Sequence, residues 1–170
     1  LQGSKDIELC DDGRAIAYER AKQIADVDFD IVYSSPLKRA YETACILRGD
    51  RDIPIIKDDR LREVNFGINE GKCSLELKKD KNSPIYKFFE DPGNYQPPEG
   101  GESLHDVCKR TKEFMEEIIE PQKDKLSNVL IAGHGAMNKG IMCHVLNHPI
   151  KEYWSGGLQK NCGIIIVKLD

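Results

Sequence analysis

The hydrophobic residues of this chain follow two patterns. Short, largely apolar runs, which are typical of buried strands, lie at residues 30–33, 53–56, 128–132 and 163–167. Two longer stretches, at residues 12–25 and 104–119, carry apolar residues at the three- and four-residue spacing of an amphipathic helix. Strands and helices that alternate in this way predict an α/β fold. We expect a three-layer sandwich in which a mostly parallel central sheet is flanked by helices on both faces.

Capping residues mark where the helices begin. Ser35 before Pro36 predicts a helix start, and that helix extends to about residue 47. Ser103 with Asp106 resembles a capping box, with Asp in place of the usual Glu, and it opens the helix over residues 104–119. Another helix is expected after the strand at 128–132, ending near residue 146.

Residues 71–101 interrupt the alternation of strands and helices. They contain four of the eight prolines and several glycines, a composition typical of an irregular insertion over a binding site. The chain has 170 residues, which suits one domain better than two. We therefore predict a single domain over residues 1–170, with 71–101 as an irregular cap.

Charge and composition narrow the possible partners. The formal net charge is −4, which argues against a nucleic-acid surface. No apolar run has membrane-spanning length, so no membrane partner is expected. The six cysteines are scattered and form no CxxC pair, which is typical of reduced thiols in a cytoplasmic protein. No histidine cluster has zinc spacing, so we expect no metal site. The oligomeric state cannot be read from these features.

The strongest local chemical signal is the end of the strand at 128–132. His134 follows it between Gly133 and Gly135, at the start of the next helix. Ligands of α/β sheets bind at this edge, and the free N–H groups of a helix start attract anions. Taken alone, the pattern fits equally well a histidine that caps the turn.

Two other stretches carry charged candidates. Arg39 lies about one turn into the helix after the strand at 30–33, where an arginine can hold a phosphate in a bidentate manner. Taken alone, a surface arginine paired with Glu42 is the simpler interpretation. Glu63 and Glu70 lie in a glycine-containing loop and have the chemistry of proton donors, although most such acids are solvated.

Together these stretches resemble the histidine phosphatase, or phosphoglycerate mutase-like, superfamily. The matching segments follow the family order and cover nearly the whole chain: LQGSKDIEL at 1–9, SSPLKRAYETA at 34–44, LREVNFGINEG at 61–71, PPEGGES at 97–103 and VLIAGHGA at 129–136. The resemblance implies the fold of phosphoglycerate mutase and a phosphomonoesterase activity. It further implies that a phosphohistidine forms without metal or cofactor.

The resemblance also assigns roles to individual residues. Arg39 and His134 would be catalytic and would bind the transferred phosphoryl group. Glu63 would be the catalytic proton donor, with Glu70 a weaker candidate. Four further residues would line the phosphate or touch the substrate: Gly135, Ala136, Gln2 and Gly3.

One family element has no counterpart in this sequence. The family's nucleophilic histidine lies in an N-terminal RHG motif on a strand before the Gln-Gly loop, and this chain starts at that loop. None of the other histidines, at 105, 144 and 148, stands in such a motif. We therefore expect residues 1–170 by themselves to be inactive, and to be unstable because an interior strand is missing.

Three functions fit these observations. The first is a phosphatase that hydrolyses small phosphorylated metabolites, and the second is a phosphoglycerate mutase. Glu63 and His134 lie 71 residues apart (134 − 63), and this short spacing favours the phosphatase. The third is a pseudo-enzyme that only binds phosphate, if the N-terminal motif is genuinely absent. The Cys-x5-Arg match at Cys45 and Arg51 is discounted, because Cys45 is expected late in a helix.

Overall fold

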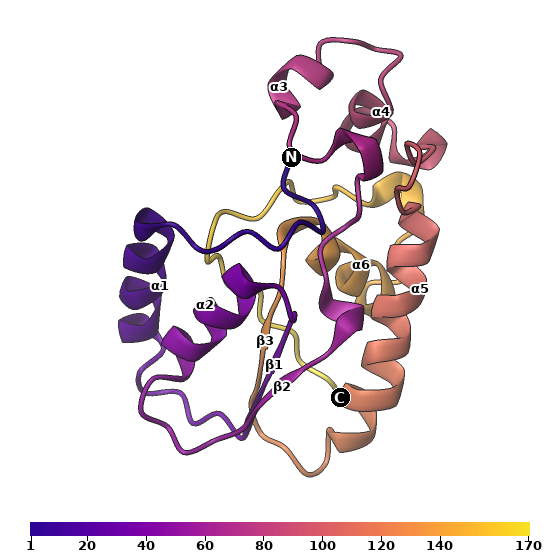
Figure 1. The fold of residues 1–170 in the computed structure, drawn as a ribbon. Coiled ribbons are helices and arrows are strands. Elements are labelled where there is room, and N and C mark those ends of the chain that lie inside the picture. The colour runs from indigo at the N-terminus through magenta and orange to yellow at the C-terminus, as the bar shows by residue number, and fades with distance from the viewer.

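A three-stranded parallel sheet lies at the centre of the computed structural model, which describes residues 1–170 (Figure 1). Its strands are β1 (Ile31–Ser34), β2 (Ile55–Lys57) and β3 (Val129–Ala132), in the order β2-β1-β3. Ile31 pairs with Val129 across β1 and β3. The two strands predicted to carry the strand-end motifs are therefore direct parallel neighbours.

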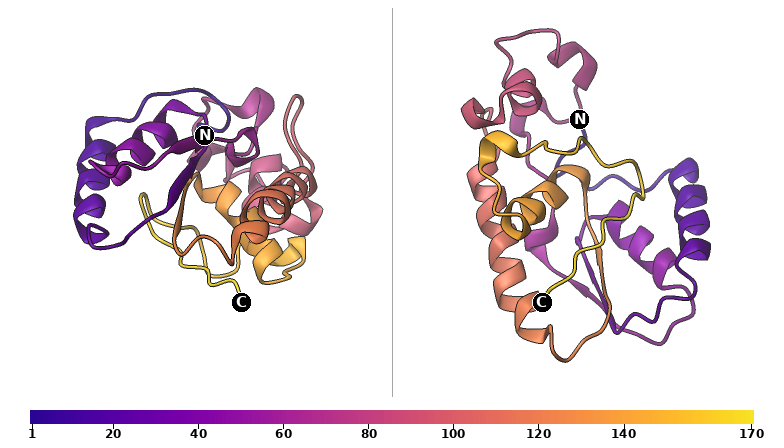
Figure 2. Two further views of the ribbon diagram at one scale, coloured as in Figure 1. Left: turned by 90° about the horizontal axis from the view of Figure 1, so that it is seen from below. Right: turned by 180° about the vertical axis from the view of Figure 1, so that it is seen from behind.

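Helices cover both faces of the sheet, as the sequence predicts (Figures 1 and 2). Helices α1 (Asp11–Gln23) and α2 (Lys38–Arg48) lie on one face, and α5 (Leu104–Phe114) and α6 (Gly135–Val145) lie on the other. The side chains of β1 alternate between these layers. Val32 packs with Ala44 of α2, whereas Tyr33 packs with Phe114 of α5. The three-layer α/β sandwich is confirmed.

The helix starts differ in how well their caps were predicted. Ser103 and Asp106 form a complete capping box at the start of α5. By contrast, α2 begins at Lys38, two residues later than the Ser35-Pro36 pattern indicates. Its first N–H, on Lys38, donates to Asp6 Oδ1 at 2.7 Å, so the cap comes from a distant loop. Such a cap cannot be read from local sequence.

The remaining helices are short. The α5 helix continues as a π-turn over Met115–Ile119 and ends in a 3-10 turn, Glu120–Gln122, close to the expected proline. Other short elements are the α-helices α3 (Ser74–Leu77) and α4 (Pro84–Glu90) and the 3-10 turns Asp59–Leu61, Gly67–Asn69, Pro92–Asn94 and Ile150–Glu152. No helix of the chain is both long and apolar enough to cross a bilayer.

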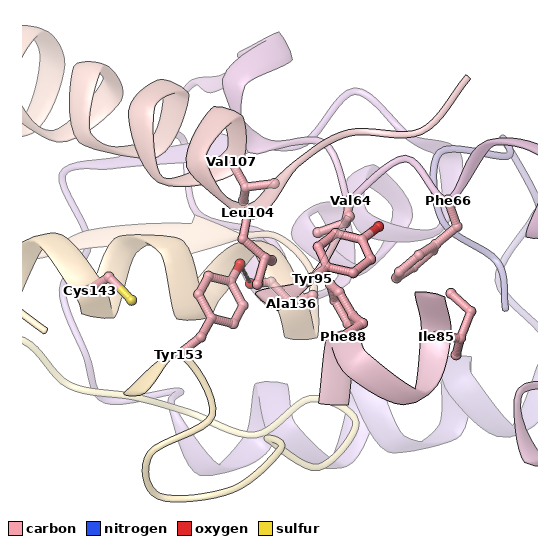
Figure 3. Close-up of a cluster of buried hydrophobic side chains, with 10 residues drawn as sticks. All are labelled: Val64, Phe66, Ile85, Phe88, Tyr95, Leu104, Val107, Ala136, Cys143 and Tyr153. Carbon is pink, nitrogen blue, oxygen red and sulfur yellow. Dashed lines mark hydrogen bonds between the residues drawn. The ribbon is translucent and has the colours of Figure 1, made fainter. Parts of the chain in front are cut away.

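Residues 71–101, the predicted cap, are held by an aromatic cluster. The Phe88 ring of α4 meets the rings of Phe66 and Tyr95 edge to face, with centroids 4.9 and 5.1 Å apart. Figure 3 shows these rings beside Val64 and Ala136, which are also buried. Val64 and Ala136 directly follow Glu63 and Gly135, so this core supports two of the segments predicted to carry chemistry.

The predicted strand at 163–167 is wrong. This segment has no regular structure, and it leaves Ile164, Ile165 and Ile166 exposed. The outer edge of β3 has no partner strand within residues 1–170. An apolar run forms a strand only where its backbone N–H and C=O groups pair with those of a neighbour, and this segment does not pair with the free edge of β3 or with any other strand.

We predict that Gly140→Ala lowers the free energy of unfolding by about 1 to 2 kcal/mol, despite a gain of about 1 kcal/mol in helix propensity. A Cβ at Gly140 of α6 would lie 2.7 Å from Thr111 Oγ1 and 3.2 Å from Val107 Cγ1 of α5. Thr111 is fully buried and donates to the Val107 carbonyl, so its side chain cannot shift without losing this hydrogen bond or displacing its neighbours. Urea denaturation of this variant and of Gly93→Ala, whose Cβ meets only ordinary contacts, measures the effect. Equal midpoints would contradict the prediction.

Candidate active site

The parallel pairing of β1 with β3 brings two strand ends together. Ser35 follows β1, and His134 lies just beyond β3 at the position before α6. His134 Nε2 lies 2.8 Å from Ser35 Oγ, and both residues are buried. The His134 side chain makes no capping hydrogen bond to α6. It therefore points into the gap between strand ends, which rules out the turn-capping interpretation.

Glu63 occupies the N-terminus of α6. It lies in the loop after the turn Asp59–Leu61, and its Oε1 accepts the Met137 N–H at 2.9 Å. Its Oε2 accepts the Ala136 N–H at 3.2 Å. A carboxylate is stabilised there because the first N–H groups of a helix are free and the helix dipole is positive. The N–H of Gly135 makes no hydrogen bond. The helix start predicted to bind phosphate thus holds an anion of the chain itself.

Arg39 is fixed by backbone carbonyls of the N-terminal loop. Its Nη1 donates to the Lys5 carbonyl at 2.7 Å, and its Nη2 donates to the Gly3 carbonyl at 2.7 Å. A guanidinium has five N–H donors, so three remain for another ligand. Gly3 is buried, whereas Gln2 is exposed to solvent. The loop predicted to touch substrate therefore also contacts the predicted phosphate-binding arginine.

Burial and nearby arginines set the protonation of this cluster. Burial raises the pKa of Glu63, although its backbone hydrogen bonds and Arg39 act in the opposite direction. Burial, followed by the charges of Arg39, Arg110 and Arg62, lowers the pKa of His134 to about 3. At neutral pH the imidazole is therefore uncharged. Glu63 holds its proton more firmly than an exposed glutamate does, which suits a proton donor.

Glu63 and His134 meet at the start of α6, where the Glu63 carboxylate accepts the N–H groups of Ala136 and Met137, and the charge of Arg39 acts on the pKa of both. The three side chains therefore lie close together. They come from three distant parts of the chain: the first turn of α2, the loop before Val64 and the end of β3. The other histidines lie elsewhere. His105 is exposed on α5, and His144, at the opposite end of α6, contacts Glu120 at 2.6 Å.

Two residues of the site were not predicted from the sequence. Ser35, interpreted only as a helix cap, accepts the Leu37 N–H just before α2 and also contacts His134. Its place at the end of a strand beside β3 is the signal that identifies it. Arg62, next to Glu63, adds positive charge near His134. In the sequence it is one of many charged loop residues, so no pattern singles it out.

The Cys-x5-Arg match at Cys45 and Arg51 does not form a phosphate-binding loop. Cys45 lies inside α2, and the Arg51 guanidinium donates to main-chain carbonyls that include those of Leu47 and Ile24. Arg51 therefore ties the C-terminal end of α2 to the end of α1, which is a structural role. The decision to discount this match is confirmed.

Known proteins resemble this chain along its whole length. A profile of the histidine phosphatase superfamily (branch 1) matches residues 1–170. Phosphoserine phosphatase 1 of Hydrogenobacter thermophilus is 30% identical over 156 residues, which cover 92% of this chain and 72% of the relative. A 2,3-bisphosphoglycerate-dependent phosphoglycerate mutase of Cytophaga hutchinsonii is 32% identical over 145 residues, covering 84% and 68%.

Solved structures agree in fold. YhfR of Bacillus stearothermophilus superposes with a TM-score of 0.84 at 34% identity, over 95% of this chain and 78% of that one. A mycobacterial glucosyl-3-phosphoglycerate phosphatase, solved with inorganic phosphate, gives a TM-score of 0.81 at 28% identity, over 95% and 80%.

The lowered pKa of His134 predicts an acid-sensitive fold. In the unfolded chain His134 binds a proton near pH 6.5, whereas in the folded chain it does so only near pH 3. Between these values the unfolded state binds more protons than the folded state. The free energy of unfolding therefore decreases by up to about 1.4 kcal/mol for each unit by which the pH is lowered. Urea denaturation from pH 7 to pH 4 should show a shallower decline for His134→Gln than for the wild type. The exposed His105→Gln variant is the control, and a decline in His134→Gln as steep as that of the wild type would contradict the assignment.

Proposed function

This chain belongs to the histidine phosphatase superfamily, and we propose that it hydrolyses small phosphorylated metabolites through a phosphohistidine intermediate without a metal ion. One observation carries the proposal: Arg39, Glu63 and His134, far apart in sequence, come together at the carboxyl ends of parallel strands, with His134 buried and the other two partly buried. Charge-assisted donors beside a helix N-terminus are suited to bind a phosphoryl group.

In the proposed complex the phosphoryl group lies between Arg39 and His134. The three remaining N–H groups of Arg39 donate to its oxygens. The neutral imidazole of His134 exchanges its contact with Ser35 for a phosphoryl oxygen. The N–H of Gly135, which has no partner, and the N–H of Ala136 complete the pocket. These donors stabilise the charge that develops on the phosphoryl oxygens in the transition state.

Glu63 would deliver the proton to the leaving oxygen. Its carboxylate now takes the Ala136 and Met137 N–H groups, so a phosphoryl oxygen that approaches α6 competes with it. The approach of a second anion favours the protonated acid, because two like charges at one helix start repel each other. Substrate binding itself would thus load the donor with its proton.

The nucleophile comes from the family resemblance. Within residues 1–170, His134 is the only histidine that the cluster contains, and its proposed role is to stabilise charge. The phosphohistidine would therefore form on the histidine of the RHG motif, which the family carries before the Gln2-Gly3 loop. Water would then attack the phosphorus and give its proton to the Glu63 carboxylate, and the P–N bond to that histidine would break to release inorganic phosphate.

A mutase is the second candidate, because a phosphoglycerate mutase is among the relatives. The two activities differ in whether water or a substrate hydroxyl accepts the phosphoryl group. The relatives also include a phosphoserine phosphatase and a glucosyl-3-phosphoglycerate phosphatase, which suggests phosphomonoesters of small hydroxy and amino acids as first substrates. Release of inorganic phosphate from phosphoserine, without an isomerised phosphoglycerate product, separates the phosphatase from the mutase.

The full-length protein should release phosphate from such esters in the presence of EDTA, because the proposed chemistry uses no metal. Arg39→Ala should lower turnover by about a hundredfold or more, since it removes charge stabilisation from the transition state. Lys22→Ala, which removes a cation from an exposed ion pair on α1, is the control and should retain wild-type turnover. Activity that is lost in EDTA and restored by magnesium would refute the metal-free mechanism.

Glu63→Gln should reduce turnover of alkyl phosphates much more than turnover of aryl phosphates, because only a poor leaving group needs a proton in the transition state. The amide oxygen of glutamine can still accept from Met137 N–H, which preserves the loop. The ratio of alkyl to aryl kcat/KM, compared between variant and wild type, measures the effect. If both substrates lose activity equally, Glu63 is not the acid.

A further inference from the structure

The carboxylate of Glu70 joins two segments that are far apart in the sequence. Its Oε1 accepts three hydrogen bonds: from Ser4 N–H at 2.7 Å, from Ser4 Oγ at 2.9 Å and from Phe66 N–H at 3.1 Å. Glu70 directly follows the turn Gly67–Asn69. One oxygen thus connects the N-terminal loop to the loop that carries Glu63.

The same N-terminal loop holds the start of α2. The carbonyls of Gly3 and Lys5 accept the two hydrogen bonds of the Arg39 guanidinium. Asp6 Oδ1 accepts the first N–H of the helix, on Lys38. Residues 3–6 therefore lie between Glu70 on one side and the phosphate-binding arginine on the other. A shift of this loop would carry the Arg39 guanidinium with it.

Gly3 leaves the Glu70 carboxylate room to approach the loop. It has φ of +56°, a conformation that favours glycine, and it is buried. A Cβ at this position would lie 2.2 Å from Glu70 Oε1. Any side chain at Gly3 would therefore expel the carboxylate or displace the loop. The carboxylate of Glu70 thus fits against Gly3 because Gly3 has no side chain, and it also accepts hydrogen bonds from the neighbouring Ser4.

We propose that Glu70 is a positioning residue of the phosphoryl-transfer site: it holds the Gly3–Lys5 loop, whose carbonyls aim Arg39 at the phosphoryl group. This inference rests on the proposed function. Glu70 is not the proton donor, because its Oε1 already accepts three hydrogen bonds from the two loops. Glu63, by contrast, contacts the start of α6 beside His134. The two glutamates thus divide the work of supplying a proton and orienting a cation.

The kinetic signature of a positioning residue differs from that of an acid. In the full-length protein, Glu70→Ala should raise KM about tenfold or more, equally for alkyl and aryl phosphates, because Arg39 then samples orientations that do not contact the substrate. The pH profile of kcat should keep its wild-type shape. Glu70→Gln should recover most of the wild-type KM, since its amide oxygen still accepts from Ser4 N–H.

Two controls make the result specific. Glu8→Gln removes an exposed carboxylate from the same N-terminal segment and should leave KM unchanged. Gly3→Ala should reproduce the KM increase of Glu70→Ala, and the double variant should be no worse than either single one, because both changes free the same loop. Circular dichroism and urea denaturation establish that each variant is folded.

A measurement without turnover tests the loop directly. The amide hydrogen of Ser4 should exchange at least about tenfold faster in Glu70→Ala than in the wild type, because its acceptor has gone. If the wild type neither turns over phosphomonoesters nor binds vanadate, the proposed function fails. Amide exchange then still tests by itself whether Glu70 holds the loop at Ser4. If the wild type is active while Glu70→Ala keeps its KM and its Ser4 protection, the inference alone is overturned. A selective loss of alkyl phosphate turnover in Glu70→Gln would instead make Glu70 the acid.

Discussion

The parallel pairing of β1 with β3 is the constraint on which the site depends. Because parallel strands end at the same edge, this pairing places Ser35 and His134 within hydrogen-bonding distance, although they are 99 residues apart in sequence. The two helices that follow these strands, α2 and α6, then both begin at this edge, on opposite faces of the sheet. One contributes Arg39 from its first turn, and the other contributes the N–H groups of its first turn, two of which hold Glu63. A strand order that placed β2 between β1 and β3 would separate these elements.

The ionisable side chains at this edge of the sheet are partly shielded from water. Burial works against the charged forms of Arg39, Glu63 and His134 alike. Neighbouring groups oppose this effect for Arg39 and Glu63, whereas nearby arginines reinforce it for His134. Arg39 is held by carbonyl oxygens and Glu63 by amide N–H groups, so the backbone supplies much of the compensation. His134 stays neutral chiefly because it is buried, and the charges of Arg39, Arg110 and Arg62 add to this effect. A phosphoryl dianion entering this cluster meets donors that are already oriented.

The loops around the site are positioned by contacts between distant segments. In the N-terminal loop, Ser4 donates its N–H to Glu70, and Asp6 accepts the N–H of Lys38 at the start of α2. On the other side, Val64 and Ala136, the neighbours of Glu63 and Gly135, are buried in the core cluster that contains Phe88 and Tyr95. The positions of Arg39, Glu63 and His134 therefore depend mainly on loop contacts and core packing outside the candidate site itself.

The sequence by itself determined the strand-helix order, the capping box at Ser103 and the motif positions of Arg39, Glu63 and His134, because periodicity and caps act over a few residues. Only the tertiary structure decided what depends on distant partners. The residues after Gly163 form no strand, because no neighbouring edge pairs with them. The α2 helix starts at Lys38 because its cap is Asp6, from outside the local sequence. Likewise, Ser35 contacts His134, and Glu70 holds a loop, through hydrogen bonds between segments 66 to 99 residues apart, which no local pattern encodes.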